Sequence, residues 1–168
     1  MSKALIVIDV QNDFVNGSLG TKEAEAIIPA VIKKIRQKKD EGWDIIYTRD
    51  THGEDYLSTN EGKNLPVVHC VKGSAGWEIF PGVYEAGSEI IDKPTFGYSG
   101  WGKYDFEEIE LIGLCTDICV ATNALILKTL FPEIDISVDA GCCAGVTKEK
   151  HIAALETLKS CQIKVYGE

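Results

Sequence analysis

Short runs of apolar residues alternate along the chain with longer segments in which apolar residues recur every three or four positions. The short runs are typical of strands buried on both faces of a parallel sheet, and the longer segments of amphipathic helices. The predicted strands span residues 4–10, 44–48, 89–92, 109–114, 134–138 and 163–166. Because strands that alternate with helices form parallel sheets covered on both faces, the pattern predicts a three-layer α/β/α sandwich with a mainly parallel, Rossmann-like sheet.

Three long helices are predicted between these strands. The first is expected to begin next to Pro29, since proline fits the first turn of a helix, and to end before Gly42. The others are predicted over residues 120–130 and 147–160. Residues 53–87 show little periodicity, apart from a short strand candidate at 67–68 and a candidate helical turn at 77–80. Irregular segments of this length inside a compact domain are usually functional.

Composition narrows the class of protein. The sequence has 168 residues without repeats or linkers, so we expect a single domain over residues 1–168. The content of 45% apolar and 26% charged residues is that of a soluble globular protein. A net charge of −9 argues against nucleic acid as a partner, because phosphate binding requires a basic face. We expect no export signal and no membrane span, and the six cysteines are expected to be reduced thiols in a cytoplasmic protein.

Cys119 is the first candidate for chemistry. It lies in the segment GLCTDICVAT, residues 113–122, between a predicted buried strand and a predicted helix. At the beginning of a helix, exposed N–H groups and the helix dipole favour a thiolate and lower the pKa of the thiol. The thiolate is the nucleophile in covalent catalysis, so Cys119 is a candidate nucleophile. The alternative is a small buried apolar residue, the usual role of a free cysteine.

Two charged residues follow other predicted strands in the same way. Asp9 and Lys93 stand at the carboxyl ends of their strands, and these ends meet at one edge of a parallel sheet. Asp9 can act as general base toward the Cys119 thiol, and Lys93 can stabilise the charged forms of both groups. The alternatives are a turn or capping partner for Asp9 and a solvated surface charge for Lys93.

A second constellation has the composition of a metal site. Asp50, His52 and His69 offer a carboxylate and two imidazoles, which suit zinc or a similar divalent ion. Glu61 and Glu54 are candidate additional ligands in the intervening loop. The alternative for His52 and His69 is that they are ordinary loop histidines held by hydrogen bonds. The remaining histidine, His151, is expected to be a surface residue.

Several motifs occur together and in a characteristic order. They are IDVQNDF at residues 8–14, YTRDTH at 47–52, HCVKG at 69–73, Lys93 before an aromatic-rich loop, and GLCTDICV at 113–120. With these motifs the whole chain resembles the isochorismatase-like cysteine hydrolases, and among them the nicotinamidase-like amidases. The resemblance implies the isochorismatase-like hydrolase fold and a homo-oligomer.

The resemblance also implies roles for individual residues. Asp9, Lys93 and Cys119 match the catalytic triad of the family. Asp50, His52 and His69 match the metal ligands of its nicotinamidases, and Glu61 stands where some members have a further ligand. The metal expected at this ligand set is zinc, with iron and manganese as alternatives. A cis peptide bond is implied at Leu114–Cys115, with the amides of Cys115 and Cys119 forming an oxyanion hole.

One departure bears on the substrate. Nicotinamidases usually have a tryptophan shortly before the metal-binding histidine, and this chain has LPVV at residues 65–68. Phe14, Tyr98 and Trp101 are the expected substrate-contacting residues in its place.

The expected function is hydrolysis of a small carboxamide, with nicotinamide as the first candidate, through a thioester on Cys119. The alternatives are another amide, a carbamoyl compound or an isochorismate-type vinyl ether, although the metal constellation argues against isochorismate. A non-catalytic metal- or ligand-binding module is the remaining alternative.

Overall fold

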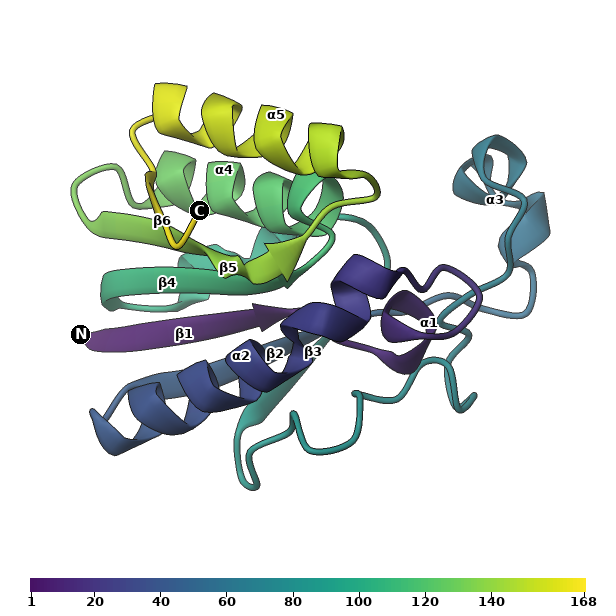
Figure 1. Ribbon diagram of the computed structural model, residues 1–168, viewed down its shortest axis with the longest axis horizontal. Coiled ribbons are helices and arrows are strands. Elements are labelled where there is room, and N and C mark those ends of the chain that lie inside the picture. Colours follow the sequence, from purple (N-terminus) through teal and green to yellow (C-terminus); the bar gives the residue numbers. More distant parts are fainter.

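The computed structural model describes residues 1–168 and contains a single six-stranded sheet, with all strands parallel (Figure 1). The strand order is β3-β2-β1-β4-β5-β6. The strands are β1 (Ser2–Ile8), β2 (Asp44–Asp50), β3 (Glu89–Lys93), β4 (Phe106–Leu114), β5 (Asp135–Ala144) and β6 (Lys164–Tyr166). The predicted parallel sheet is therefore confirmed, and β1 lies near its centre.

Helices cover both faces of the sheet. The long helix α2 (Lys22–Asp40) lies on one face, and α4 (Ala121–Leu130) and α5 (Lys148–Ser160) lie on the other (Figure 1). Two short helices, α1 (Asn12–Val15) and α3 (Asn60–Asn64), lie beyond the carboxyl ends of the strands. Three further turns are helical: Tyr56–Ser58, Ser99–Lys103 and the π-helical turn Thr116–Val120.

Alternate residues of the central strands build two separate cores. On β1, Ile6 and Ile8 pack toward α4 and α5, whereas Leu5 and Val7 pack toward α2. These residues are fully buried, and each such side chain contributes roughly 1.5–3 kcal/mol of transfer free energy. The sheet is therefore a rigid platform, and its carboxyl edge can hold side chains in fixed positions. None of the helices combines the length and the apolar character that crossing a bilayer would require.

The expected beginning of the first long helix is wrong. Helix α2 begins at Lys22, where the Thr21 side chain accepts a hydrogen bond from the Ala24 N–H, and Pro29 lies inside the helix. Pro29 is exposed, so water can reach the Glu25 carbonyl, which has no N–H partner at this proline. A proline on the solvent face therefore does not mark a helix boundary here.

Other local predictions also differ from the structure. Strand β5 continues to Ala144, beyond its expected end at residue 138: after an irregularity in register it pairs again with β4 at Cys143 and Ala144, and Asp139 within the irregular part pairs with Lys34 of α2 at 2.8 Å. The strand candidate at residues 67–68 belongs to no strand, and residues 77–80 form no helix; Ile79 makes an isolated antiparallel bridge with Gln11. The irregular segment is instead held by hydrogen bonds to α1, described below.

Candidate active site and metal centre

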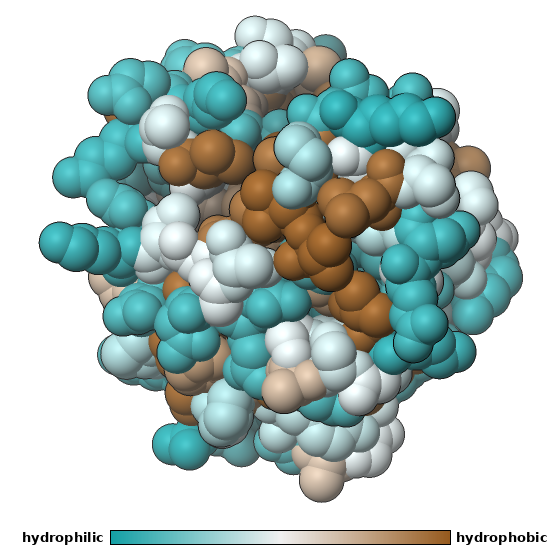
Figure 2. All heavy atoms as spheres, turned by 90° about the vertical axis from the view of Figure 1, so that its right-hand side faces the viewer, coloured by the Kyte–Doolittle hydropathy of each residue, from teal (hydrophilic) through white to brown (hydrophobic).

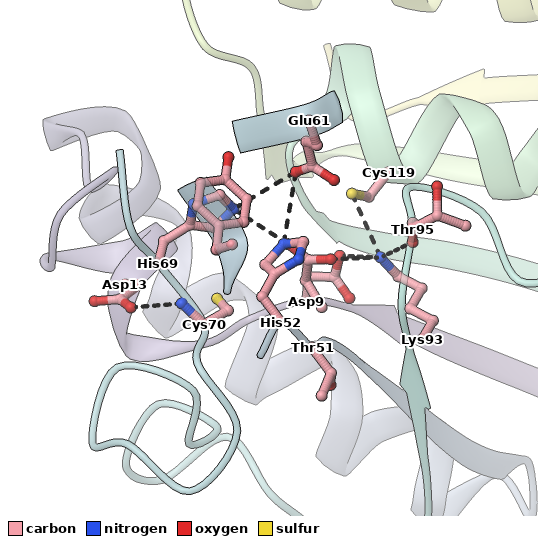
Figure 3. Close-up of polar contacts among 12 residues, drawn as sticks. Asp9, Asp13, Thr51, His52, Glu61, His69, Cys70, Lys93, Thr95 and Cys119 are labelled. Carbon is pink, nitrogen blue, oxygen red and sulfur yellow. Dashed lines mark hydrogen bonds and ion pairs between the residues drawn. The ribbon is translucent and has the colours of Figure 1, made fainter. Parts of the chain in front are cut away.

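The candidate catalytic residues come from three elements that end at the same edge of the sheet (Figure 3). Asp9 directly follows β1, and Lys93 is the last residue of β3. Cys119 lies in the π-helical turn that connects β4 with α4. Asp9 and Lys93 are fully buried and Cys119 is 4% exposed, so the structure brings all three together out of contact with bulk water.

Lys93 contacts both of the other groups. Its ammonium Nζ lies 2.6 Å from Asp9 Oδ2 and 3.5 Å from Cys119 Sγ, and it donates to the Thr95 carbonyl at 3.1 Å (Figure 3). The second oxygen of the Asp9 carboxylate accepts a hydrogen bond from Thr48 Oγ1 at 2.6 Å. One cation thus fixes a carboxylate and a thiol side by side, the arrangement that proton transfer from sulfur to carboxylate requires.

The expected lowering of the Cys119 pKa is wrong. Burial raises the pKa of the Cys119 thiol, the Asp9 carboxylate raises it further, and Lys93 offsets only part of this effect. Cys119 also lies before α4, which begins at Ala121, so it does not belong to the first turn of that helix. The thiol is therefore protonated at rest and needs a base when it reacts.

Burial and neighbouring charges together set the pKa values of the two charged partners. Burial raises the pKa of Asp9, and Lys93 opposes this effect in part. Burial acts to lower the pKa of Lys93, but Asp9, Cys119 and Asp50 raise it above its ordinary value. Lys93 therefore remains charged, and it is the fixed positive charge of the group.

Beside this group, four side chains converge on one point (Figure 3). The ligand atoms of Asp50, His52, Glu61 and His69 lie within 4.8 Å of one another. Asp50 Oδ2 lies 2.9 Å from His52 Nε2 and 3.4 Å from His69 Nε2, and Glu61 Oε1 lies 3.5 Å from His52 Nε2. Glu54, the other candidate ligand, is exposed and lies outside this group.

The four side chains fit a divalent metal. Asp50 Oδ1 is buried without a hydrogen-bond partner, and its nearest charged neighbour, Lys93 Nζ, is 3.9 Å away, so the carboxylate can still accept a cation. The His69 Nδ1 hydrogen bond to the Val67 carbonyl, at 2.7 Å, orients the ring so that Nε2 faces the group. Two imidazoles and two carboxylates are a donor set that zinc, iron and manganese accept.

The pKa shifts in this group indicate an excess of negative charge. Burial raises the pKa of Glu61, and the neighbouring Asp50 raises it further. Burial acts to lower the pKa of His69, but its hydrogen bonds to Asp50 and the Val67 carbonyl, together with the charges of Asp50 and Glu61, raise it above its ordinary value. Burial acts to raise the pKa of Asp50, but its hydrogen bonds to His52 and His69 and the charge of Lys93 hold it below its usual range. The shifts of Glu61 and His69 favour their protonated forms, which offset the charge of Asp50 as a bound cation would.

A cavity of about 280 Å³ opens beside both groups. Its polar lining includes Cys115, Cys119, Asp50, Glu61 and His69, and most of its other lining residues are apolar. The carboxyl edge of the sheet faces the viewer in Figure 2, which shows apolar side chains gathered near the centre of this face. The peptide bond between Leu114 and Cys115 is cis, at the position that the resemblance implies.

Only one of the three expected substrate-contacting residues lines the cavity. Phe14 does, whereas Tyr98 and Trp101 do not line it, so the contact of these two residues with substrate stays a prediction. Trp101 is fully buried against α4 and donates its indole N–H to Asn123 Oδ1 at 2.9 Å. The aromatic loop packs against the helix here, and its Phe96 lines the cavity.

Asn123 is a positioning residue that the sequence did not single out. Its Nδ2 donates to the carbonyls of Cys119 at 2.8 Å and Phe96 at 3.1 Å, and its Oδ1 accepts from the Tyr98 N–H and the Trp101 indole. This buried amide therefore joins the segment that carries Cys119 to the loop that follows Lys93.

Gln11 is a second positioning residue, and it supports the metal-ligand group. Its Nε2 donates to the carbonyls of Asp50 and Trp77, both at 2.9 Å, and its Oε1 accepts from the Asp50 N–H at 2.8 Å. Asp13 Oδ2 accepts from the Cys70 N–H at 2.8 Å, next to His69 (Figure 3). The polar run at residues 11–13 directly after a buried strand was the signal for these contacts.

His151 is not the surface residue expected from the sequence. It is half-buried, and its Nδ1 lies 2.7 Å from the hydroxyl of Thr116 in the π-helical turn. Burial lowers its pKa more than Asp117 and Glu168 raise it. His151 thus joins α5 to the turn that carries Cys119.

The parallel sheet, with its buried acid–lysine–cysteine group and adjoining metal-ligand group, defines an α/β protein with its site at the carboxyl edge. The family model of the isochorismatase domain matches residues 3–167, so the chain belongs to the isochorismatase family.

Related proteins share both sequence and fold with this chain. The nicotinamidase/pyrazinamidase of Mycobacterium tuberculosis is 26% identical over 186 residues, which cover 97% of each protein. The crystal structure of the pyrazinamidase of Pyrococcus horikoshii in complex with zinc has a TM-score of 0.88 and 30% identity, and covers 100% of both chains. The pyrazinamidase/nicotinamidase of Streptococcus mutans has a TM-score of 0.87 and 28% identity, over 98% of this chain and 100% of that one.

Proposed function

We propose that this protein is an amidase that hydrolyses a small carboxamide to a carboxylate and ammonia, through a thioester on Cys119. The observation that carries the proposal is the position of Lys93, whose ammonium contacts both Asp9 and Cys119 beside a cavity of about 280 Å³. Relatives named nicotinamidase or pyrazinamidase support an amide substrate, and nicotinamide is the first compound to test.

In the first half of the reaction, the Asp9 carboxylate takes the proton of the Cys119 thiol as sulfur attacks the amide carbon. The amide N–H groups of Cys115 and Cys119 are the proposed donors to the oxyanion that develops on the carbonyl oxygen. The carbon–nitrogen bond then breaks, Asp9 returns the proton to nitrogen, and ammonia leaves. Lys93 stays charged throughout and stabilises the carboxylate and the developing thiolate.

In the second half, water replaces ammonia. Asp9 takes a proton from the water as its oxygen attacks the thioester carbon, and the bond from carbon to sulfur breaks. The acyl group leaves as a carboxylic acid that ionises, and Cys119 regains its proton. One water is consumed for each amide hydrolysed, so the cycle balances without a further reactant.

Asp50, His52, His69 and Glu61 are the proposed ligands of a divalent metal, most simply zinc, with iron and manganese as alternatives. A related pyrazinamidase structure contains zinc, which supports this choice. When bound, the metal would supply a Lewis-acidic position beside the nucleophile that orients a substrate nitrogen or a water. Asp50 also faces Lys93 at 3.9 Å, so this group lies directly beside the proposed catalytic residues.

Ammonia release from nicotinamide tests the proposal. Cys119→Ala is expected to abolish it, and Cys161→Ala, which changes an exposed thiol away from the cavity, is expected to retain it. Hydroxylamine added during turnover should divert the acyl group to a hydroxamate, because it attacks a thioester more readily than water does. Parental activity in Cys119→Ala, or no amide hydrolysis at all, would reject the mechanism, and the latter would favour a non-catalytic binding module.

A second candidate is hydrolysis of a different small substrate, such as another amide, a carbamoyl compound or an isochorismate-type vinyl ether. The observation in its favour is the cavity wall, which Leu65 lines; it belongs to the stretch LPVV at residues 65–68, where the resemblance to nicotinamidases implies a tryptophan. A panel of these compounds separates the two candidates, since saturable turnover of nicotinamide above all others would reject the second.

A further inference from the structure

Three large apolar side chains surround the mouth of the cavity and remain exposed to solvent. Leu65 follows α3, Phe96 follows β3, and Val146 follows β5, and all three line the cavity. Their side chains are 41%, 43% and 43% exposed, respectively. We call these three residues the apolar rim. They come from three separate loops, so no single helix or strand explains why they gather here.

The exposed fractions of the lining residues show which end of the cavity is deep and which is open. Cys119 is 4% exposed, whereas each rim residue is more than 40% exposed, so the reactive sulfur lies at the inner end and the rim at the outer end. Phe14, Leu19 and Ile118 line the cavity as well. An amide placed at Cys119 must therefore direct the rest of its acyl group along apolar walls toward the rim.

Single exposed apolar residues are common on protein surfaces, but apolar residues grouped around a cavity mark a binding surface. Figure 2 shows such a grouping near the centre of the carboxyl-edge face. Lys150 is the only lysine or arginine that lines this cavity, so the rim offers little to a charged acyl group. A cavity of about 280 Å³ is also at the lower limit for an enclosed ligand, so a longer substrate would extend over the rim.

We infer that the substrate of this site is a carboxamide with an apolar extension, an alkyl or alkyl-aryl acyl group that the rim covers. The inference rests on the proposed amide hydrolysis and adds a substrate class to it. Each methylene group that passes from water onto the rim contributes about 0.8 kcal/mol, or about fourfold in affinity. The gain appears in kcat/KM as long as the extension stays in contact with the rim.

A series of straight-chain amides from acetamide to octanamide tests the inference, with ammonia release as the measurement. We expect kcat/KM to rise by about two- to fourfold for each added methylene until the chain passes the rim. Phe96→Ser and Val146→Ser should each flatten this increase. Leu130→Ser is the matched control, because Leu130 is 44% exposed, lies at the end of α4 and does not line the cavity.

The outcomes separate this inference from the proposed function. Hydrolysis of short amides without any gain from chain length would overturn the inference and leave the amidase in place. The same holds if succinamate, which ends in a carboxylate, is preferred over butanamide, since Lys150 would then select the substrate. Titration calorimetry of the series with Cys119→Ala measures the same gradient in binding without turnover, and equal affinity for all chain lengths would also overturn the inference.

Discussion

The ammonium group of Lys93 lies between two buried carboxylates, 2.6 Å from Asp9 Oδ2 and 3.9 Å from Asp50 Oδ1. Lys93 and Asp9 are both fully buried, so their mutual attraction must offset the cost of removing both charges from bulk solvent. Removing one partner of such a pair costs more than replacing both, because the remaining charge stays buried without a partner. The stability of the site therefore depends on the pair as a unit.

Lys93→Met tests this dependence. We expect it to destabilise the protein by about 3–5 kcal/mol, because Asp9 keeps a buried charge without a partner. The double variant Asp9→Asn/Lys93→Met should recover much of that loss, although neither variant is expected to be active. Urea unfolding of both variants and the parent measures the coupling, and equal stabilities of the single and double variants would contradict it.

Gly113 shows how one residue decides whether two strands can pair. It faces Ile8 across the β1–β4 pair and has a φ of 123°, in the region that favours glycine. A methyl group at this position would overlap the Ile8 carbonyl oxygen. Asp9, which follows β1, belongs to the site, and Leu114, the last residue of β4, lines the cavity, so the close approach of the strands also sets the geometry of the site.

Gly113→Ala is therefore expected to cost more than about 3 kcal/mol or to prevent folding, because both the overlap and the backbone conformation oppose it. Gly102→Ala is the control, because open space surrounds its position and its φ is not in the glycine region. Circular dichroism and thermal unfolding of the two variants give the comparison. A Gly113→Ala protein as stable as Gly102→Ala would show that the strands can separate without loss.

At the scale of elements, the edge of the sheet that carries the site was predictable, and the contacts that support the site were not. The apolar runs placed Asp9 and Lys93 at one edge, because parallel strands end together. Thr21, which caps α2 eight residues before Pro29, gave a weaker signal than the proline, so the helix was predicted too short. Likewise, the sequence could not show that Trp101 faces Asn123, a contact between segments far apart in the chain.

The short polar segment around α1 is the element that supports the metal group. Gln11 makes hydrogen bonds to the N–H and the carbonyl of Asp50, and Asp13 makes one beside His69. These contacts hold β2 and the loop of residues 69–77 at fixed positions relative to β1. The ligands are therefore preorganised by residues that do not themselves belong to the metal group.

Gln11→Leu should weaken zinc binding by about 10–100-fold, because supporting contacts of this kind orient the ligands. Gln37→Leu removes an exposed amide on α2 that bonds Glu41, and it should leave zinc binding unchanged. Competition with a coloured chelator measures both affinities, and thermal unfolding of the metal-free proteins separates loss of fold from loss of orientation. Equal zinc affinities in the two variants would show that Asp50 is held without Gln11.

At the scale of the whole molecule, the two faces of the sheet differ in the contacts that they make. The α2 face carries a buried ion network in which Lys34 contacts Glu110 at 3.2 Å and Asp139 at 2.8 Å, and Tyr166 of β6 bonds the same Glu110. This network joins α2 to β4, β5 and the edge strand. The α4–α5 face instead supports the π-helical turn of Cys119, through Asn123 on α4 and His151 on α5. Strand β4 takes part on both sides, because its Glu110 belongs to the ion network and the strand leads directly into the turn that carries Cys119.

The link through His151 makes the stability of the molecule depend on pH. Burial lowers the pKa of His151 below its ordinary value of 6.5, so the unfolded chain binds a proton at pH values where the folded protein does not. The stabilising contribution is complete above pH 6.5 and is lost as the pH falls through the lowered pKa. We expect the melting temperature to fall less between about pH 8 and about pH 5.5 in His151→Gln than in the parent. His69, whose pKa is raised, has the opposite effect in both proteins and cancels in the comparison. An equal fall in both proteins would mean that protonated His151 is accommodated at the contact with Thr116.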